Sequence, residues 1–283
     1  MKTVIHPNFS KNNCYDTTAK VCSMLHNMSF ELYSYTDLEP RFPKTSFVRF
    51  GYPEEVTRDA DLIIAIGGDG TILQASAYAS KYDKLLLGIN TGRLGFMAAI
   101  EYDGLYKLSK LMSRSYTVMD RMLLECTHFH GGTSDTYTSL NEVVIASKIG
   151  HLSDFEVKID DLSVSRVRAD GVIFSTPTGS TAYALSAGGP ILSPDLQCIQ
   201  VTPICPHSLS SRTMVFSPTK PLDLVIPSSR TTTYITVDGV SVATMDVEDK
   251  LVFRVSEKKL HLIDIDGNSF YNAVNNKLMS PMK

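Results

Sequence analysis

The residues best suited to chemistry form the motif Gly-Gly-Asp-Gly-Thr at positions 67–71. A short apolar run of strand type at residues 61–66 precedes the glycines, and residues 72–79 read as a helix. A strand, a tight glycine turn and a helix N-terminus form an anion site, because backbone N–H groups converge there and the helix dipole favours negative charge. Asp69 is unexpected in a pure phosphate cradle, because a carboxylate about 4 Å from a phosphate is repelled by roughly 1 kcal/mol in water.

An acid in this turn has two chemical uses. It can take a proton from an attacking hydroxyl, or it can hold a metal ion between phosphates. The structural alternative is a glycine-rich turn in which Asp69 caps the following helix. Short glycine motifs occur in many unrelated proteins, so this motif by itself leaves the chemical and the structural interpretations open.

A second stretch rich in glycine and hydroxyl groups occupies residues 168–190. Residues 172–174 read as a strand that Pro177 ends, and residues 181–187 can form about two helical turns before the next glycines. Tyr183 offers a flat face for a base. The structural alternative is a polar crossover between strands. The hydroxyls that could donate to phosphate or sugar oxygens belong to Thr176, Thr178, Ser180 and Thr181.

Three further polar positions have weaker signals. Asn141 and Glu142 lead into an apolar run, and an amide can pair with an adenine edge while a carboxylate can accept from ribose hydroxyls. The same pair also suits a solvated strand end. His128 and His130 would share one face of a strand, but the sequence places no third and fourth zinc ligand near them. His207 reads as a loop histidine.

The elements that must position these residues change in character along the chain. Strand-like runs alternate with helical patterns up to about residue 115, which predicts a parallel sheet wrapped by helices. Residues 40–55, rich in proline and glycine, are predicted to be loop. From residue 116 short strands follow one another, among them one at 136–146 and separate ones at 251–255 and 260–265, which predicts a β-sandwich.

We therefore expect a two-domain protein with a helical C-terminal segment. The predicted domains are an α/β nucleotide-binding domain of Rossmann type at 1–115, a β-sandwich domain at 116–265, and a segment at about 266–283 that packs back on the first domain.

Composition narrows the possible partners. The chain has 283 residues and a net charge of −3, so no basic excess is present to neutralise nucleic-acid phosphates. Its aliphatic runs are far shorter than the roughly 18 residues that a membrane span needs. The five cysteines are scattered without Cys-x-x-Cys spacing, which favours a reducing cytosol and provides no metal framework. We expect a cytoplasmic protein with neither nucleic acid nor a membrane as a partner.

Several stretches together resemble the bacterial NAD kinase family. They occur in the family's order from about residue 61 onward, whereas the earlier residues match only loosely. The Gly-Gly-Asp-Gly motif is shared with phosphofructokinases, diacylglycerol kinases and sphingosine kinases, but Ser-Thr-Pro-Thr-Gly-Ser-Thr-Ala-Tyr at 175–183 is far more specific. The stretches that carry the resemblance are residues 67–71, 90–96, 141–143, 170–190, 202–210 and 271–278.

The resemblance implies a reaction as well as a fold. It implies that ATP phosphorylates the 2′-hydroxyl of the adenosine ribose of NAD, giving NADP, with a divalent metal, usually Mg²⁺, as cofactor. The fold that it implies is an α/β N-terminal domain and a β-sandwich C-terminal domain, assembled as a homodimer or homotetramer.

The resemblance also implies roles for individual residues. Asp69 would be the general base, with Gly68 and Gly70 beside it, and Phe96 would pack on adenine. Asp170 would reach a neighbouring subunit's site. The other implied substrate-binding residues are Asn141, Glu142, Arg168, Thr178, Thr181, Ala182, Tyr183, Ala184, Leu185 and Ser186, with Cys205 close by.

Two departures from the family pattern leave alternatives open. Val240 follows Asp238 and Gly239 where the family often has Gln or Arg, and the C-terminal Lys277-Leu278 lacks the Gly-Trp that some members carry. One alternative is a lipid kinase of the diacylglycerol kinase type, although the block at 175–183 is too polar to suggest an apolar groove. Another is a non-catalytic NADP sensor that has kept the pocket, although Asp69 is intact.

Overall fold

The chain folds into two compact units. The computed structural model describes residues 1–44, 47–92, 95–228, 231–265, 267 and 269–279. The first unit contains Met1–Asp120 and Leu260–Lys283, and the second contains Arg121–Lys259. Both positions at which the units divide lie within long strands, β7 (Thr117–His130) and β18 (Lys250–Asp264). The predicted boundaries, near residues 115 and 265, lie instead at the ends of these strands, where the local sequence pattern changes.

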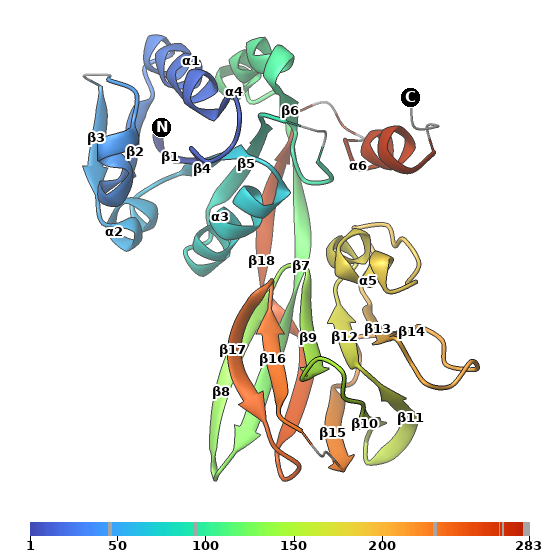
Figure 1. Ribbon diagram of the computed structural model, residues 1–283. Coiled ribbons are helices and arrows are strands. Elements are labelled where there is room, and N and C mark those ends of the chain that lie inside the picture. The colour runs from blue at the N-terminus through green and yellow to red at the C-terminus, as the bar shows by residue number, and fades with distance from the viewer. Residues whose placement is uncertain (45–46, 93–94, 229–230, 266, 268, 280–283) are drawn as a thin grey trace. The chain divides into compact units, whose positions relative to one another are not determined.

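The first unit is built on a parallel sheet in the order β3-β2-β1-β4-β5, and the last residues of β18 pair with β5 beyond it (Figure 1). From β1 the chain proceeds outward in one direction to β2 and β3, and later in the other direction to β4 and β5, so the sheet reverses its winding at the β1/β4 pair. Its strands are β1 (Lys2–Pro7), β2 (Glu31–Tyr35), β3 (Val48–Gly51), β4 (Leu62–Gly67), β5 (Leu85–Asn90) and β6 (Ile100–Glu101).

Helices cover the sheet because its strands are apolar on both faces, as buried parallel strands must be. Helix α1 (Cys14–Asn27) buries Val21 and Leu25 in a cluster with Ile5 of β1, and α3 (Asp69–Lys81) lies along β4 and β5 (Figure 1). The remaining helical segments are η1 (Thr36–Arg41), α2 (Pro53–Arg58), η2 (Tyr102–Ser109), α4 (Lys110–Ser113), α6 (Ser269–Val274) and η4 (Asn275–Met279).

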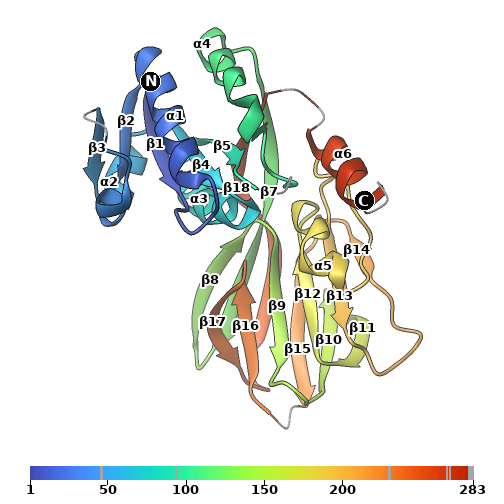
Figure 2. The same ribbon diagram turned by 45° about the horizontal axis from the view of Figure 1, so that its top comes forward.

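The second unit is a sandwich of antiparallel sheets. One sheet has the order β14-β13-β12-β9-β16-β17, and the other contains β11-β10-β15 beside the first part of β18, together with β7 and β8 (Figure 2). Phe174 of β12 stacks on Phe253 of β18 with ring centroids 3.7 Å apart, which joins the two sheets through the core.

The bounds of the second unit's remaining elements are β8 (Thr133–Ser139), β9 (Glu142–Ser147), β10 (Ser153–Ile159), β11 (Leu162–Ala169), β12 (Gly171–Ser175), η3 (Thr178–Thr181), α5 (Tyr183–Ser186), β13 (Ile199–Ile204), β14 (Met214–Phe216), β15 (Leu222–Ser228), β16 (Thr233–Val237) and β17 (Val240–Met245). The predicted combination of an α/β unit and a β-sandwich unit is confirmed. No helix among the described residues is long and apolar enough to cross a membrane.

Some local predictions were wrong. Residues 40–55 are not all loop, because β3 gains its hydrogen bonds from β2 in parallel pairing, and α2 then begins at Pro53. The predicted helix at 181–187 is only the single turn α5, because Ala182 has a non-helical backbone (φ −97°, ψ −128°).

Some strand ends were also predicted at the wrong residues, because contacts with residues distant in the sequence determine where these strands end. The predicted strand at 136–146 is two strands, β8 and β9, because the N–H groups of Leu140 and Asn141 bond the Asp238 carboxylate. Conversely, the two strands predicted at 251–255 and 260–265 form one continuous strand, β18. The sequence pattern also missed β13, β14 and β17.

Candidate active site

The glycine motif lies where β4 ends and α3 begins. Gly68 is the N-cap of α3, Asp69 is its first residue, and no side-chain hydrogen bond from a described residue caps this end of the helix. Thr71 N–H donates to the Gly68 carbonyl at 2.9 Å, which leaves the N–H groups of Asp69 and Gly70 as the donors without a described backbone partner at this turn. The Asp69 carboxylate does not cap α3, because it accepts hydrogen bonds from another loop instead.

The glycines of the motif serve two different purposes. A Cβ on Gly67 would collide with the side chain of Thr71, so the packing of the turn requires glycine there. A Cβ on Gly68 or Gly70 would have no described atom within 4 Å. The packing of the described residues does not explain these two glycines, and they leave open space beside the free donors for a ligand to approach the backbone.

The Asp69 carboxylate is held by backbone donors from another loop. Phe96 N–H donates to its Oδ2 at 2.9 Å and Met97 N–H to its Oδ1 at 3.3 Å. A Cβ on Gly95 would collide with the same carboxylate, so glycine is required for this close approach. The side chain remains 32% exposed, so the acid has a fixed orientation and an open side. Arg93 and Leu94 of the predicted stretch at 90–96 lie outside the described residues.

A lysine from the C-terminal segment reaches the same place. The ammonium of Lys277 lies 3.8 Å from Asp69 Oδ2 and 4.3 Å from the centroid of the Phe96 ring. Phe270 of α6 contacts Phe96 at a centroid distance of 6.5 Å. The sequence pattern assigned Lys277 no role, because no local pattern tells which distant residue a terminal lysine contacts.

In the second unit, Asn141 and Glu142 lie at the start of β9 beside a buried acid. The Asp238 carboxylate accepts from the N–H groups of Leu140, Asn141 and Glu142 at 2.8, 2.9 and 3.1 Å. The side-chain amide of Asn141 has no hydrogen bond within the described part of the chain. In the sequence Asp238 stood out only as the start of a departure from a pattern, whereas the structure shows that it organises this strand end.

Burial sets the charge of Glu142. The residue is 8% exposed, and its Oε2 has no hydrogen-bond partner among the described residues. Desolvation and then the neighbouring Asp238 carboxylate raise the pKa of Glu142 to about 7, while the backbone N–H of Tyr183 acts in the opposite direction. Burial also raises the pKa of Asp238, against three backbone hydrogen bonds that lower it. Glu142 therefore titrates near neutral pH.

The polar stretch after β12 packs directly against this strand end. Thr176 N–H donates to the Asn141 carbonyl at 2.9 Å, and Thr176 Oγ1 donates to the Leu140 carbonyl at 2.5 Å. A Cβ on Gly179 would collide with the backbone of Asn141, so the stretch can approach this closely only with glycine. The predicted residues at 178–186 and the pair Asn141–Glu142 are thus brought together.

The short helix of this stretch lies on the outer face of the sandwich, against β12 (Figure 2). Ala184 of α5 packs with Ile173 and Ile204, while Tyr183 is 44% exposed. In the same stretch, Thr178 is buried, Ser186 is exposed, and Thr181, Ala182 and Leu185 are half-buried.

Arg168, Asp170 and Cys205 lie at the other end of β12. Asp170 N–H donates to the Ile204 carbonyl at 3.0 Å, which places Asp170 beside Cys205, and Cys205 is exposed with a left-handed backbone (φ 44°). Arg168 lines a separate cavity of about 400 Å³ together with His207. Ser175 pairs with Glu142 and Gly171 with Ala146, so the full length of β12 separates this group from Asn141 and Glu142.

The candidate histidines are accounted for by ordinary contacts. His128 pairs with Asp249 at 2.9 Å and His130 with Asp135 at 2.8 Å. Among the described residues, no three His, Cys, Asp or Glu side chains gather where they could hold a metal ion.

Two family models match most of the chain. Models of the ATP-NAD kinase N-terminal and C-terminal domains match residues 4–116 and 140–265. The NAD kinase of Teredinibacter turnerae is 40% identical over 228 residues, which cover 79% of this chain and 78% of that protein.

Solved structures are similar over nearly the whole chain. Yeast NADH kinase complexed with NADH has a TM-score of 0.88 and 25% identity, and the match covers 100% of this chain and 89% of that one. An NAD kinase from Archaeoglobus fulgidus in complex with ATP has a TM-score of 0.73 and 25% identity, with 96% and 95% coverage.

Proposed function

The chain belongs to the ATP-NAD kinase family and transfers the γ-phosphate of ATP to the 2′-hydroxyl of the adenosine ribose of NAD, and from this premise we propose that Asp69 accepts the proton of that hydroxyl. The attacking oxygen forms its bond to the γ-phosphorus as the bond to ADP breaks, and its proton passes to a carboxylate oxygen of Asp69. Positioning provides most of the acceleration, and a general base adds typically ~10²–10⁴-fold.

One observation carries this proposal: a carboxylate fixed by two backbone donors remains about one-third exposed, next to Gly68 and Gly70 in the chain. A base must be oriented and accessible, and Asp69 is both. The outward N–H groups at the start of α3 stabilise phosphate oxygens, and the absence of a Cβ on either glycine lets a phosphate approach them.

The remaining roles concern recognition of the dinucleotide. We propose that Phe96 packs on adenine and that Asn141 and Glu142 hydrogen-bond the dinucleotide. The unpartnered Glu142 Oε2 and the unpartnered Asn141 amide support these roles, because a ligand can supply the missing hydrogen bonds. The other proposed contacts are Arg168, Asp170, Thr178, Thr181, Ala182, Tyr183, Ala184, Leu185, Ser186 and Cys205.

The divalent metal that the family implies fits as a partner of ATP. Mg²⁺ is usually bound by one or two carboxylates together with substrate phosphates. The glycine turn offers one carboxylate, and the described residues contain no larger cluster of metal ligands. We propose that Mg²⁺ would be held chiefly by the triphosphate of ATP, whose charge it would neutralise.

We further propose a cytoplasmic homodimer or homotetramer. The five cysteines form no disulfide, and four of them are buried, which suits a reducing compartment. Ile149 and Leu209, both more than nine-tenths exposed, are apolar side chains that a subunit interface could cover. Light scattering of the purified protein measures the oligomer directly, and a monomer at assay concentration would contradict this part of the proposal.

A coupled assay tests the function. Purified protein receives ATP, Mg²⁺ and NAD, and an NADP-specific dehydrogenase reports NADP while ADP release is measured in parallel. We expect equal amounts of NADP and ADP. When diacylglycerol replaces NAD and the ATP carries a label on its γ-phosphate, we expect no labelled lipid. Binding of NADP without release of ADP would identify a sensor instead. Parallel assays in which NADH replaces NAD, or polyphosphate replaces ATP, define the range of acceptors and donors.

A further inference from the structure

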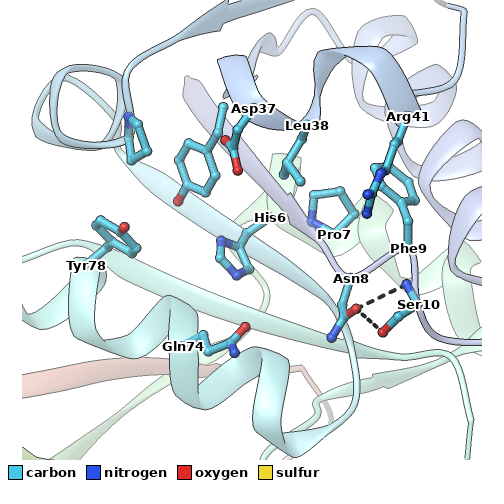
Figure 3. A pocket seen from close by; sticks show the side chains of 12 residues that line it. His6, Pro7, Asn8, Phe9, Ser10, Asp37, Leu38, Arg41, Gln74 and Tyr78 are labelled. Atoms are coloured by element: carbon cyan, nitrogen blue, oxygen red, sulfur yellow. Dashed lines mark hydrogen bonds between the residues drawn. The ribbon is translucent and has the colours of Figure 1, made fainter. Parts of the chain in front are cut away.

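A cavity of about 380 Å³ in the first unit contains none of the predicted site residues (Figure 3). Gln74 and Tyr78 of α3 line one side, and Asp37 and Arg41 of η1 line the other. His6 of β1 lies between them at the base. The volume falls in the range of ~300–1,000 Å³ that is typical of small-molecule sites.

The position of this cavity in the sheet favours a nucleotide. His6 is near the carboxyl end of β1, and β1/β4 is the pair at which the sheet reverses its winding. Ligands of open α/β sheets bind outside the carboxyl ends of the strands at such a switch point. In dinucleotide-binding folds an acid at the end of the second strand bonds ribose hydroxyls. Asp37 follows the end of β2 by two residues.

The polar groups of the cavity match the parts of a nucleotide. Asp37, Arg41 and Gln74 are exposed, and their side chains have no hydrogen bond or ion pair within the described part of the chain. His6 Nδ1 is buried without a hydrogen-bond partner there. Burial lowers the pKa of His6 to about 4, although Asp37 opposes the shift, so the imidazole is neutral at neutral pH. Arg41 is then the cation of the lining, suited to phosphate.

The cavity leads to the glycine turn. Its wall continues through Asn8 and Ser10, where Asn8 Oδ1 accepts from the N–H and the hydroxyl of Ser10 (Figure 3). Asn8 N–H donates to the Ile66 carbonyl at 2.9 Å, one residue before the glycines. Gln74 lies in the same helix that begins at Asp69. A triphosphate extending past Asn8 would thus arrive at the N–H groups that start α3.

We propose that this cavity binds the nucleoside of the donor ATP, with ribose hydroxyls on Asp37, the base against His6 and Tyr78, and phosphates on Arg41. The proposal rests on the proposed function, because it assigns a place to the ATP of that reaction. It explains why a cavity with unpartnered polar groups adjoins the turn that holds Asp69.

The experiment compares Michaelis constants for the two substrates. Arg41→Met and Asp37→Asn should raise the KM for ATP by roughly 10- to 100-fold, because each removes a charged hydrogen-bond partner. The KM for NAD should remain within about threefold of the parent value, as expected for a separate site. Titration calorimetry with AMP-PNP, a non-hydrolysable ATP analogue, should show the same loss of affinity without turnover.

Matched controls lie on the same segment but outside the cavity. Glu39→Gln and Lys44→Met change exposed charges near Asp37 and Arg41, and both should leave the KM for ATP within about twofold. Circular dichroism melting verifies that every variant folds.

The outcomes separate the two proposals. A parent protein that forms no NADP refutes the proposed function. A parent that forms NADP, while Arg41→Met and Asp37→Asn keep the parental KM for ATP, refutes only the assignment of this cavity. An increase in the KM for NAD alone, or displacement of AMP-PNP by NAD, would show that NAD binds in the cavity. Either result would overturn the inference as well.

Discussion

Asp69 and Glu142 are both carboxylates at the first residue of an element, yet their surroundings differ. Asp69 is about one-third exposed, accepts from two backbone N–H groups and has an ammonium 3.8 Å away. Glu142 is buried beside another acid, and its pKa is raised to about 7. The role of each acid thus follows from its exposure to solvent and from the hydrogen-bond donors around its carboxylate. The accessible, oriented acid suits proton acceptance, whereas the buried acid suits recognition of a ligand that completes its hydrogen bonds.

The largest expected effect comes from removing the proton acceptor at Asp69. Asp69→Asn keeps the size of the side chain but removes the proton acceptor, so turnover should fall by roughly 10²- to 10⁴-fold while the affinity for NAD changes little. Single-turnover kinetics and equilibrium titration with NAD measure the two quantities. Asp61→Asn, an exposed acid just before β4, is the control and should be near parental. If the turnover of Asp69→Asn stayed within a few-fold of that of the parent, Asp69 would not be the general base.

The glycines beside the two acids provide a second contrast, in stability. Gly179→Ala forces a Cβ into the backbone of Asn141, and overpacking of this kind should lower the free energy of unfolding by about 1–3 kcal/mol. Gly68→Ala places its Cβ in open space and should change the free energy of unfolding by no more than about 0.5 kcal/mol while reducing turnover. Urea denaturation and the coupled assay compare the variants. If Gly68→Ala lowered the free energy of unfolding as much as Gly179→Ala, the space beside Gly68 would not be open.

The pH dependence of stability tests the buried acid. The pKa of Glu142 is about 7 in the folded state against 4.5 for an ordinary glutamate, so the unfolded state ionises first as pH rises. The folded state then binds more protons, and Glu142 makes the protein progressively less stable between pH 4.5 and about 7.

Glu142→Gln removes this titration, so the variant should gain on the order of 2 kcal/mol relative to the parent between pH 5 and pH 8. Urea denaturation at each pH measures the difference, and titrating groups that do not interact with Glu142 cancel in the comparison. Glu257→Gln changes an exposed glutamate in the same unit and should show no such trend. A difference independent of pH would mean that Glu142 is ionised throughout.

The smallest expected effect concerns the ammonium that Asp69 has and Glu142 lacks. Lys277 lies over the Phe96 ring that is proposed to meet adenine. Lys277→Ala uncovers that ring, and because half-exposed pairs of this kind contribute about 1 kcal/mol, the KM for NAD should fall by only about two- to fivefold. Lys258→Ala, an exposed lysine of β18, is the control. A higher KM for NAD in Lys277→Ala would show that the lysine contacts the substrate instead.

Local sequence pattern was sufficient for much of the fold, and it identified the candidate residue of the site. The apolar run before the glycines predicted β4, and the residues after them predicted α3, because each pattern depends on neighbours in the sequence. The alternation of strands and helices, followed by strands alone, predicted both units. The motif at 67–71 drew attention to Asp69, because an acid is unexpected beside a turn suited to phosphate, but it left the chemical and the capping interpretations open.

Tertiary structure decided what depends on residues far apart in the chain. The orientation of Asp69 comes from the loop before β6 and from the C-terminal segment, and the break between β8 and β9 comes from Asp238. The raised pKa of Glu142 comes from burial, which sequence spacing does not reveal. The cavity at His6 joins β1, η1 and α3, whose residues share no motif. Sequence by itself determined which groups are present and which short elements carry them, whereas packing determined their partners, exposure and charge, because these arise only when distant segments exclude water together.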